Sequence, residues 1–227
     1  MSCLEKTSGK AGKGVDRARE SSVWPGVLLV LAMLLWASSF IALKLAFESY
    51  HPMAVIFGRM LVAAVCFLFL AKRLGGNQWR PGDLKYLAFM VMCEPCLYFL
   101  FEAQAVRNTT ASQAGMVTAM LPLLVAVGAS AVLHEKVTGR TLSGFALAIV
   151  GVCILGASGS ASASAPHPAL GNFLEFVAMV CATGYNITLK KLTERYSPLF
   201  LTALQAFVGA IFYLPFLFLP GVGLPGE

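Results

Sequence analysis

The sequence predicts an all-α integral membrane protein with seven transmembrane helices: one complete five-helix repeat and the first two helices of a second, inverted repeat. The first observation behind this fold is composition. Hydrophobic residues make up 58% of the 227 residues and charged residues only 12%, and the mean hydropathy is +0.75. A soluble domain carries about 25% charged residues to cover its surface. The spacing of apolar stretches and an internal repeat are the second and third observations.

Seven apolar stretches are predicted to form spans, because a helix needs about 20 mainly apolar residues to cross the hydrocarbon core. The fifth stretch is the shortest. In chain order they are Trp24–Phe47, Met53–Ala71, Leu84–Ala105, Ser112–Leu133, Leu142–Ala157, Ala169–Leu189 and Leu199–Leu219.

Prolines and glycines mark the gaps between these stretches. Pro52 and Pro198 stand where the second and seventh helices would begin, a position that proline favours. Gly75, Gly76 and Gly82 interrupt the chain between the second and third spans, where glycine is typical of loops.

Residues 1–23 are predicted to form a basic cytoplasmic tail. A basic segment before an apolar run also resembles a secretory signal peptide, but this run is too long and six more spans follow it, so we expect the first span to be retained. The net charge of +6 is interpreted as topology information. No nucleic acid is expected as a partner.

Basic residues concentrate on one predicted side of the membrane. The tail carries five, and the gaps after the even-numbered spans carry nine of the 17 lysines and arginines, whereas the opposite side carries only Arg107. Because loops rich in Lys and Arg stay in the cytoplasm, we expect a multi-pass protein of the inner cell membrane with its N-terminus in the cytoplasm.

An internal repeat relates the first two spans to the last two. A shift of 146 residues aligns them without a gap, and the matched polar and turn residues are Lys44, Glu48, Tyr50 and Pro52 with Lys190, Glu194, Tyr196 and Pro198. An odd number of spans separates the copies, so they cross the membrane in opposite directions. Inverted repeats are typical of alternating-access carriers, whose substrate site lies near the midplane.

The repeat gives the predicted domain organisation. Residues 24–157 form a first five-span repeat, and residues 169–227 form a partial second repeat of two spans. Residues 158–168 are rich in Ser, Ala and Pro and form an external linker.

Six motifs occur in order along the chain: Leu34–Phe40, Lys44, Phe57–Arg59, Ala105–Gly115, Leu121-Pro122 and His134–Thr138. Together they resemble the EamA family of the drug/metabolite transporter superfamily. The resemblance covers residues 24–157 as one five-span unit. It implies a carrier of two such units, with ten helices. Because the sequence has only seven spans, we expect three missing C-terminal helices or a second chain, for example in a homodimer, to complete the cavity.

Glu94 is the main candidate for a residue that binds a proton or substrate. It lies about ten residues, or about 15 Å, into the third span, and ionisable groups at such depth are expensive and commonly functional. We expect it to bind a proton or a substrate ammonium; the alternative is a structural kink at Pro95, which cannot donate a backbone hydrogen bond. Arg59 could pair with Glu94 or Glu102, or bind a substrate carboxylate; the alternative is that it extends outward to water.

Other polar residues in the spans are weaker candidates for a functional role. Lys44 is expected to extend outward to water, and Glu102 and Glu175 are expected close to the outer surface in contact with water. Pro122 predicts a second helix kink. Side chains that could contact a ligand, or alternatively bridge helices, are Trp36, Gln104, Gln113, Thr118, Asn186 and Gln205.

An enzyme is not expected, and neither is a cofactor. His51, His134 and His167 lie in predicted loops far apart in sequence, so neither a serine-protease triad nor a zinc site is predicted. Cys93 and Cys96 form a C-x-x-C inside a span without a nearby histidine, which favours packing over metal or redox chemistry.

The expected function is a secondary transporter that exports small metabolites, amino acids or drugs by alternating access, with proton coupling through Glu94. The alternatives are a truncated, non-transporting fragment and a seven-helix membrane receptor or interaction protein. Receptors of that class place the N-terminus outside, contrary to the basic tail.

Overall fold

The computed structural model describes residues 23–70, 80–133, 138–158, 161–163, 165–219 and 222. The predicted basic tail, except Val23, lies outside the described residues. So do the gap residues Lys72, Arg73, Gly75, Gly76, His134 and Lys136. The chain divides into an N-terminal unit, Met1–Ser39, and a second unit, Phe40–Glu227, and each is described by itself.

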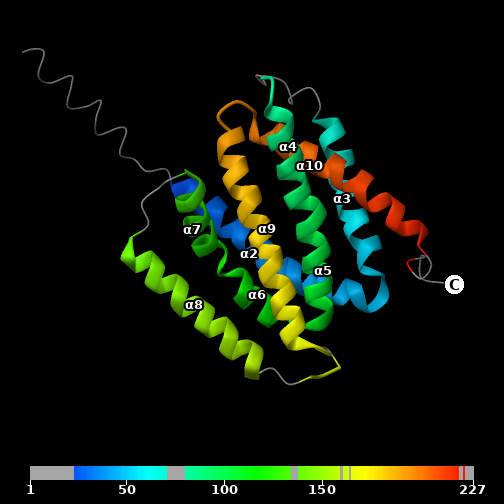
Figure 1. Cartoon of the computed structure of the whole chain (residues 1–227). Helices are drawn as coiled ribbons and strands as arrows, with labels where there is room; N and C mark the ends of the chain where they lie inside the picture. Colours follow the sequence, from blue (N-terminus) through cyan, green and yellow to red (C-terminus); the bar gives the residue numbers. More distant parts are fainter. Residues whose placement is uncertain are drawn as a thin grey trace, which may run out of the picture. The chain divides into compact units, whose positions relative to one another are not determined.

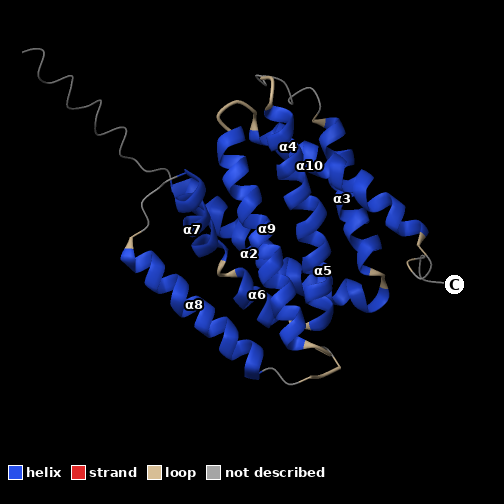
Figure 2. Ribbon diagram, in the orientation of Figure 1, coloured by secondary structure: helices blue, strands red, loops and turns tan. Residues whose placement is uncertain are grey.

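The described residues of the predicted spans are mainly helical, and short loops join the spans, as Figure 2 shows. The elements are α2 (Val23–Ser49), α3 (Pro52–Phe69), α4 (Asp83–Val91), η2 (Met92–Leu97), α5 (Tyr98–Asn108), α6 (Ala111–Thr118), α7 (Leu121–Leu133), α8 (Gly139–Ser158), α9 (Pro168–Leu192), α10 (Pro198–Tyr213) and η3 (Leu214–Phe218). Each of the seven predicted spans coincides with one helix or with consecutive helices. The predicted all-α membrane fold is confirmed.

Helix α9 contacts more of the described elements than any other helix does. Within the described residues, the segments long and apolar enough to cross a membrane are Trp24–Ser49, Pro52–Phe69, Asp83–Asn108, Ala111–Val132 and Pro198–Phe218, and Gly139–Ile154 is a shorter apolar helix. Helix α9 contacts α4, η2, α5, α6, α7 and α8, and Figure 1 shows it between α5 and α8. Because several helices pack against one face of α9, the polar side chains on that face can bond to protein instead of facing lipid.

The helices that follow the repeated turn begin in the same way. Pro52 and Pro198 each occupy the first helical position, where the missing N–H is not needed. The residue before each proline caps the helix: His51 Nδ1 accepts from the backbone N–H of Met53 at 3.3 Å, and Ser197 Oγ accepts from the N–H of Phe200 at 3.2 Å.

The third span is broken at Glu94. This residue has an extended backbone (φ −146°, ψ 120°) inside the π-helical turn η2, and Pro95 after it has no N–H to donate. Side chains of α10 bond the carbonyl groups at the break. Tyr213 Oη lies 2.6 Å from the Cys96 carbonyl and 3.1 Å from the Pro95 carbonyl, and Gln205 Nε2 donates to the Glu94 carbonyl at 3.2 Å.

Replacing Tyr213 by phenylalanine should therefore lower the free energy of unfolding by about 1 kcal/mol, since the carbonyl groups of Pro95 and Cys96 lose the one O–H donor that they share. Titration of the detergent-solubilised protein with a denaturing detergent measures this change. Tyr50→Phe is the matched control, because Tyr50 is 48% exposed; equal stability of the two variants would contradict the role of Tyr213.

The fourth span is interrupted near Pro122. Helix α6 ends at Thr118 and α7 begins at Leu121. The N–H groups of Leu123 and Leu124 both lie 3.0 Å from the Met120 carbonyl. Pro122 thus occupies the first turn of a new helix, where proline is tolerated because an N–H at that position has no partner within the helix.

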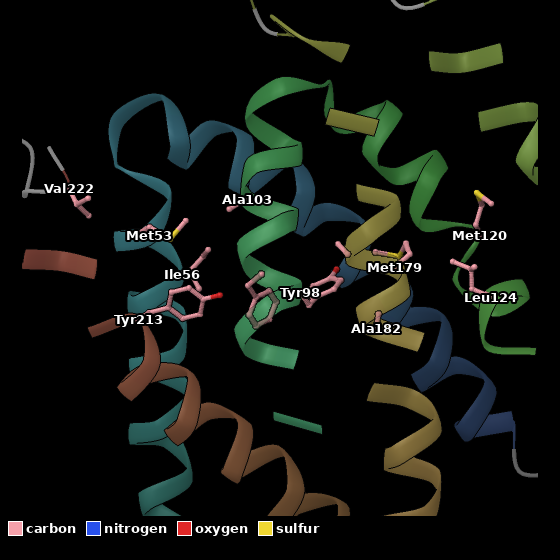
Figure 3. Packing of buried hydrophobic residues seen from close by; sticks show 12 residues of the cluster. Met53, Ile56, Tyr98, Ala103, Met120, Leu124, Met179, Ala182, Tyr213 and Val222 are labelled. Atoms are coloured by element: carbon pink, nitrogen blue, oxygen red, sulfur yellow. The ribbon is translucent and has the colours of Figure 1, made fainter. Parts of the chain in front are cut away.

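The core of the second unit is packed with Met, Ile, Ala and aromatic side chains. Figure 3 shows Tyr98 on α5 between Tyr213 and Ile56 on one side and Met179 on the other. Glycines allow helices to approach: a Cβ added to Gly209 on α10 would lie 2.7 Å from Met60 Sδ and 2.9 Å from Pro95 Cγ. Small residues at helix contacts are typical of membrane proteins.

Candidate functional site

Arg59 of α3 and Glu102 of α5 face each other between the helices. The Arg59 Nη1 atom lies 3.9 Å from Glu102 Oε2, and the Glu102 side chain is 4% exposed compared with 36% for Arg59. The guanidinium also lies over the Phe99 ring, 4.6 Å from its centroid. The second carboxyl oxygen of Glu102 accepts a hydrogen bond from Tyr98 Oη at 2.7 Å. Arg59 is thus held by an anion and an aromatic face while part of it stays accessible.

Glu94 lies near this pair, at the break in the third span. It is partly buried, and it interacts electrostatically with Glu102 and Arg59. Among the residues that the structure describes, its carboxylate has no hydrogen bond and no ion pair. The break therefore presents a carboxylate whose oxygens are available to a ligand.

Glu175 of α9 is fully buried, with 0% exposure. Its Oε1 lies 2.8 Å from Thr118 Oγ1 on α6, and its Oε2 has no partner among the described residues. The expectation that Glu102 and Glu175 are in contact with water is wrong: both turn toward neighbouring helices, because they lie on the helix faces that pack together.

A second polar group joins α9 to the turn between α5 and α6. Thr109 Oγ1 lies 2.6 Å from Gln113 Oε1 and 2.9 Å from Asn172 Oδ1. Lys44 lies here too, with Nζ donating to the carbonyl groups of Val106 at 2.6 Å and Thr109 at 2.8 Å. Lys44 does not extend outward to water as expected. It satisfies carbonyl groups at the C-terminal end of α5, where a cation is favoured.

The remaining predicted ligand contacts have local bonds. Asn186 Nδ2 donates to the Ala182 carbonyl one turn back on α9, at 2.7 Å. Gln104 is partly buried, and its backbone carbonyl accepts a hydrogen bond from Asn108 Nδ2 at 2.7 Å. Trp36 belongs to the N-terminal unit, where its carbonyl accepts from Ser39 Oγ at 2.6 Å. The second unit therefore groups Arg59, Glu94 and Glu102, while Asn186 is bonded within its own helix.

The start of α4 is bonded to the turn between α9 and α10. Asp83, 3% exposed, accepts from Arg195 Nη1 at 2.8 Å and from Tyr196 Oη at 3.1 Å. Burial, together with Asp83, raises the pKa of Tyr196, so its hydroxyl keeps the hydrogen that it donates. This cluster joins segments more than 110 residues apart.

The described residues contain no group of three or more His, Cys, Asp or Glu side chains arranged to hold a metal ion. Cys93 and Cys96 are buried, and both thiols are free. The C-x-x-C thus lies in the packed interior at the break of the third span.

A helical membrane protein that places buried carboxyl groups and a partly exposed arginine between its spans has the features of a transport protein, in which such groups mark substrate and ion pathways. The chain belongs to the EamA-like transporter family, which matches residues 24–157. This confirms the resemblance seen in the sequence, and it agrees with the expectation that the protein is not an enzyme.

Several curated transporters are similar to most of the chain. It is 29% identical over 196 residues to the uncharacterized transporter YetK of Bacillus subtilis, covering 84% of this chain and 58% of that protein. It is 26% identical over 196 residues to a probable terminal-alkyne amino-acid exporter of Streptantibioticus cattleyicolor (86% and 64%). It is 28% identical over 190 residues to an S-adenosylmethionine/S-adenosylhomocysteine transporter of Chlamydia trachomatis (81% and 58%). The chain spans about three fifths of the length of these relatives.

The spacing of buried residues in α9 could have identified Glu175 as an inward-facing group. Asn172, Glu175, Met179 and Ala182 recur every three or four residues and are all buried. That spacing places them on one helix face. The depth of Glu175 along the span does not show which face of the helix carries its carboxyl group.

Proposed function

We propose that the protein is a secondary carrier that exports small metabolites bearing an α-amino-acid group. Membership in a transporter family supports the activity. Two relatives are named for an amino acid and for S-adenosylmethionine, and both kinds of compound contain an ammonium and a carboxylate group. The shared chemistry points to a zwitterionic substrate.

The observation that carries this proposal is the pairing of opposite charges around the break in the third span. The partly exposed Arg59 offers a guanidinium, whose fork of N–H donors matches a carboxylate. Glu94 offers a carboxylate free to accept from an ammonium. A zwitterion would replace the loose 3.9 Å contact between Arg59 and Glu102 with a closer bond to Arg59. Gln104 and Asn186 are proposed as further contacts of the substrate, and Trp36, which belongs to the N-terminal unit, stays a prediction from the sequence.

Alternating access between inverted repeats is the proposed mechanism. Residues 24–157 would form one repeat and residues 169–227 part of the other, joined by an external linker over residues 158–168. The matching proline-initiated helices at Pro52 and Pro198 support this division. The distribution of basic residues supports a cytoplasmic N-terminus in the inner membrane.

Uptake of radiolabelled S-adenosylhomocysteine and of L-amino acids into vesicles containing the intact protein tests the proposal. For a transported probe, Arg59→Gln should raise KM about tenfold, since a charge-assisted bond to the carboxylate is lost. Glu94→Gln should reduce kcat/KM by a similar factor, because the charged bond between the Glu94 carboxylate and the substrate ammonium is lost. Membrane insertion should not change.

Arg107→Gln is the matched control, because Arg107 is exposed at the end of α5. A wild-type protein that is folded in the vesicles but transports none of the probes would contradict the proposed function. Unchanged kinetics in both Arg59→Gln and Glu94→Gln would contradict the proposed site.

A further inference from the structure

Two buried polar side chains of α9 each have one atom bonded and one atom without a partner in the described part of the chain. These atoms are Asn172 Nδ2 and Glu175 Oε2, from side chains with 3% and 0% exposure. The two residues are three positions apart, so they share one face of the helix. Buried polar groups are almost always hydrogen-bonded, and an exception calls for a functional explanation.

The hydrogen bonds around Thr118 suit a carboxyl group that gains and loses a proton. Thr118 Oγ1 lies 2.8 Å from Glu175 Oε1 and 3.0 Å from the Ala114 carbonyl, but a hydroxyl has only one hydrogen to donate. If Glu175 is protonated, its O–H donates to Thr118, and Thr118 donates to Ala114. If Glu175 is ionised, Thr118 turns its hydrogen to the carboxylate.

Among the described residues, no cation forms an ion pair with the ionised form of Glu175. The titratable groups facing it are Glu102 and Tyr98 of α5, and Arg59 is already engaged by Glu102. Helices α6 and α7 contain no ionisable residue. The ionisable residues of the other helices packed on α9 are the exposed Arg140 and Cys153 of α8, Glu94, Cys93 and Cys96 of η2, and Asp83, Lys85 and Tyr86 of α4.

We propose that Glu175, Thr118 and Asn172 form a proton-binding site, separate from the Arg59–Glu102 pair, that carries the proton coupled to transport. On release, the carboxyl O–H turns away from Thr118 toward a water molecule that enters beside the group and is hydrogen-bonded to Asn172, the O–H bond breaks, and the proton passes to this water. Thr118 then donates its hydrogen to the carboxylate. The inference rests on the proposed carrier function and deepens it, because it identifies the ion and the residue of coupling.

Infrared difference spectroscopy of the intact protein in lipid vesicles tests the site directly. Titration between about pH 5 and pH 9, which spans the range of buried carboxyl groups, should show the C=O stretching band of a protonated carboxyl that disappears on ionisation. Glu175→Gln should remove this band, and Thr118→Val should shift its frequency because the hydroxyl partner is lost. Glu194→Gln, at an exposed carboxyl, should leave it unchanged.

A Glu175→Gln spectrum with the same titrating carboxyl bands as the wild type would overturn the proposal, as would a Thr118→Val spectrum identical to that of the wild type. This readout does not depend on flux, so a wild-type protein that transports no probe would refute the carrier function and leave the proton site intact.

A flux measurement tests the coupling itself. For a probe that the wild type accumulates in response to a pH gradient, Glu175→Gln should reduce accumulation about tenfold, while exchange of labelled for unlabelled probe continues. Accumulation equal to that of the wild type in Glu175→Gln would overturn the coupling role.

Discussion

Replacing Gly171 by alanine is expected to lower the free energy of unfolding by about 3 kcal/mol, at the upper end of the usual effect of overpacking. Gly171 lies on the buried face of α9, against the turn that follows α5. An added Cβ would lie 2.7 Å from Thr109 Cβ, 2.8 Å from Thr109 N and 2.9 Å from the carbonyl carbon of Asn108. Two of these atoms are backbone atoms, so no side-chain rotation can relieve the clash.

The separation of α9 from the turn would also break the polar group at this contact. Asn172 bonds Thr109 at 2.9 Å, and Lys44 bonds the Thr109 carbonyl at 2.8 Å. The measurement is detergent titration of the purified protein. The matched control is Gly115→Ala in α6, where an added Cβ meets nothing within 4 Å and alanine favours the helix. Equal stability of the two variants would show that the contact at Gly171 tolerates a methyl group.

Replacing Arg195 by alanine is expected to destabilise the protein by about 3 kcal/mol, since removing one partner of a buried ion pair leaves the other charge uncompensated. Asp83 has a 4% exposed side chain, whereas Arg195 is 24% exposed. Without the arginine, Asp83 keeps only the Tyr196 hydroxyl among its described partners. Helix α4 and the turn between α9 and α10 should therefore separate more easily, which thermal unfolding would detect as a lower Tm.

A double-mutant cycle isolates this interaction. Asp83→Asn combined with Arg195→Ala removes both charges, so the double variant should be more stable than Arg195→Ala alone. Arg140→Ala, at an exposed position of α8, should leave the Tm unchanged. Additive losses for Asp83 and Arg195 would mean that the two residues stabilise the protein independently.

The positions of the helices follow from the sequence because the bilayer imposes a length and an apolar composition on each span. Helix α3 begins at Pro52 and α10 at Pro198, as their prolines predict. The family follows as well, since its motifs occur in order along residues 24–157. Contacts between helices do not follow from the sequence in this way, because apolar spans use the same residue types toward lipid and toward protein.

The candidate site shows most clearly which contacts the sequence alone does not determine. Counting residues from the end of a span gives the depth of Glu102 and Glu175 but not their partners, and both carboxyl groups proved to be buried between helices. Lys44 was expected in water, yet it bonds carbonyl groups more than 60 residues away. Sequence reasoning considered Arg59 with either Glu94 or Glu102, and only the packing of α3 against α5 determined that Glu102 is the closer partner.

The sequence by itself thus determined the spans, the family and the presence of ionisable groups inside the membrane, because each depends on composition and order along the chain. The tertiary structure decided which of those groups meet. It joined Asp83 to Arg195 across 112 residues and placed Glu175 against Thr118. In a low-dielectric interior a polar group must find a partner within about 3 Å, and such a distance is fixed only when the helices pack.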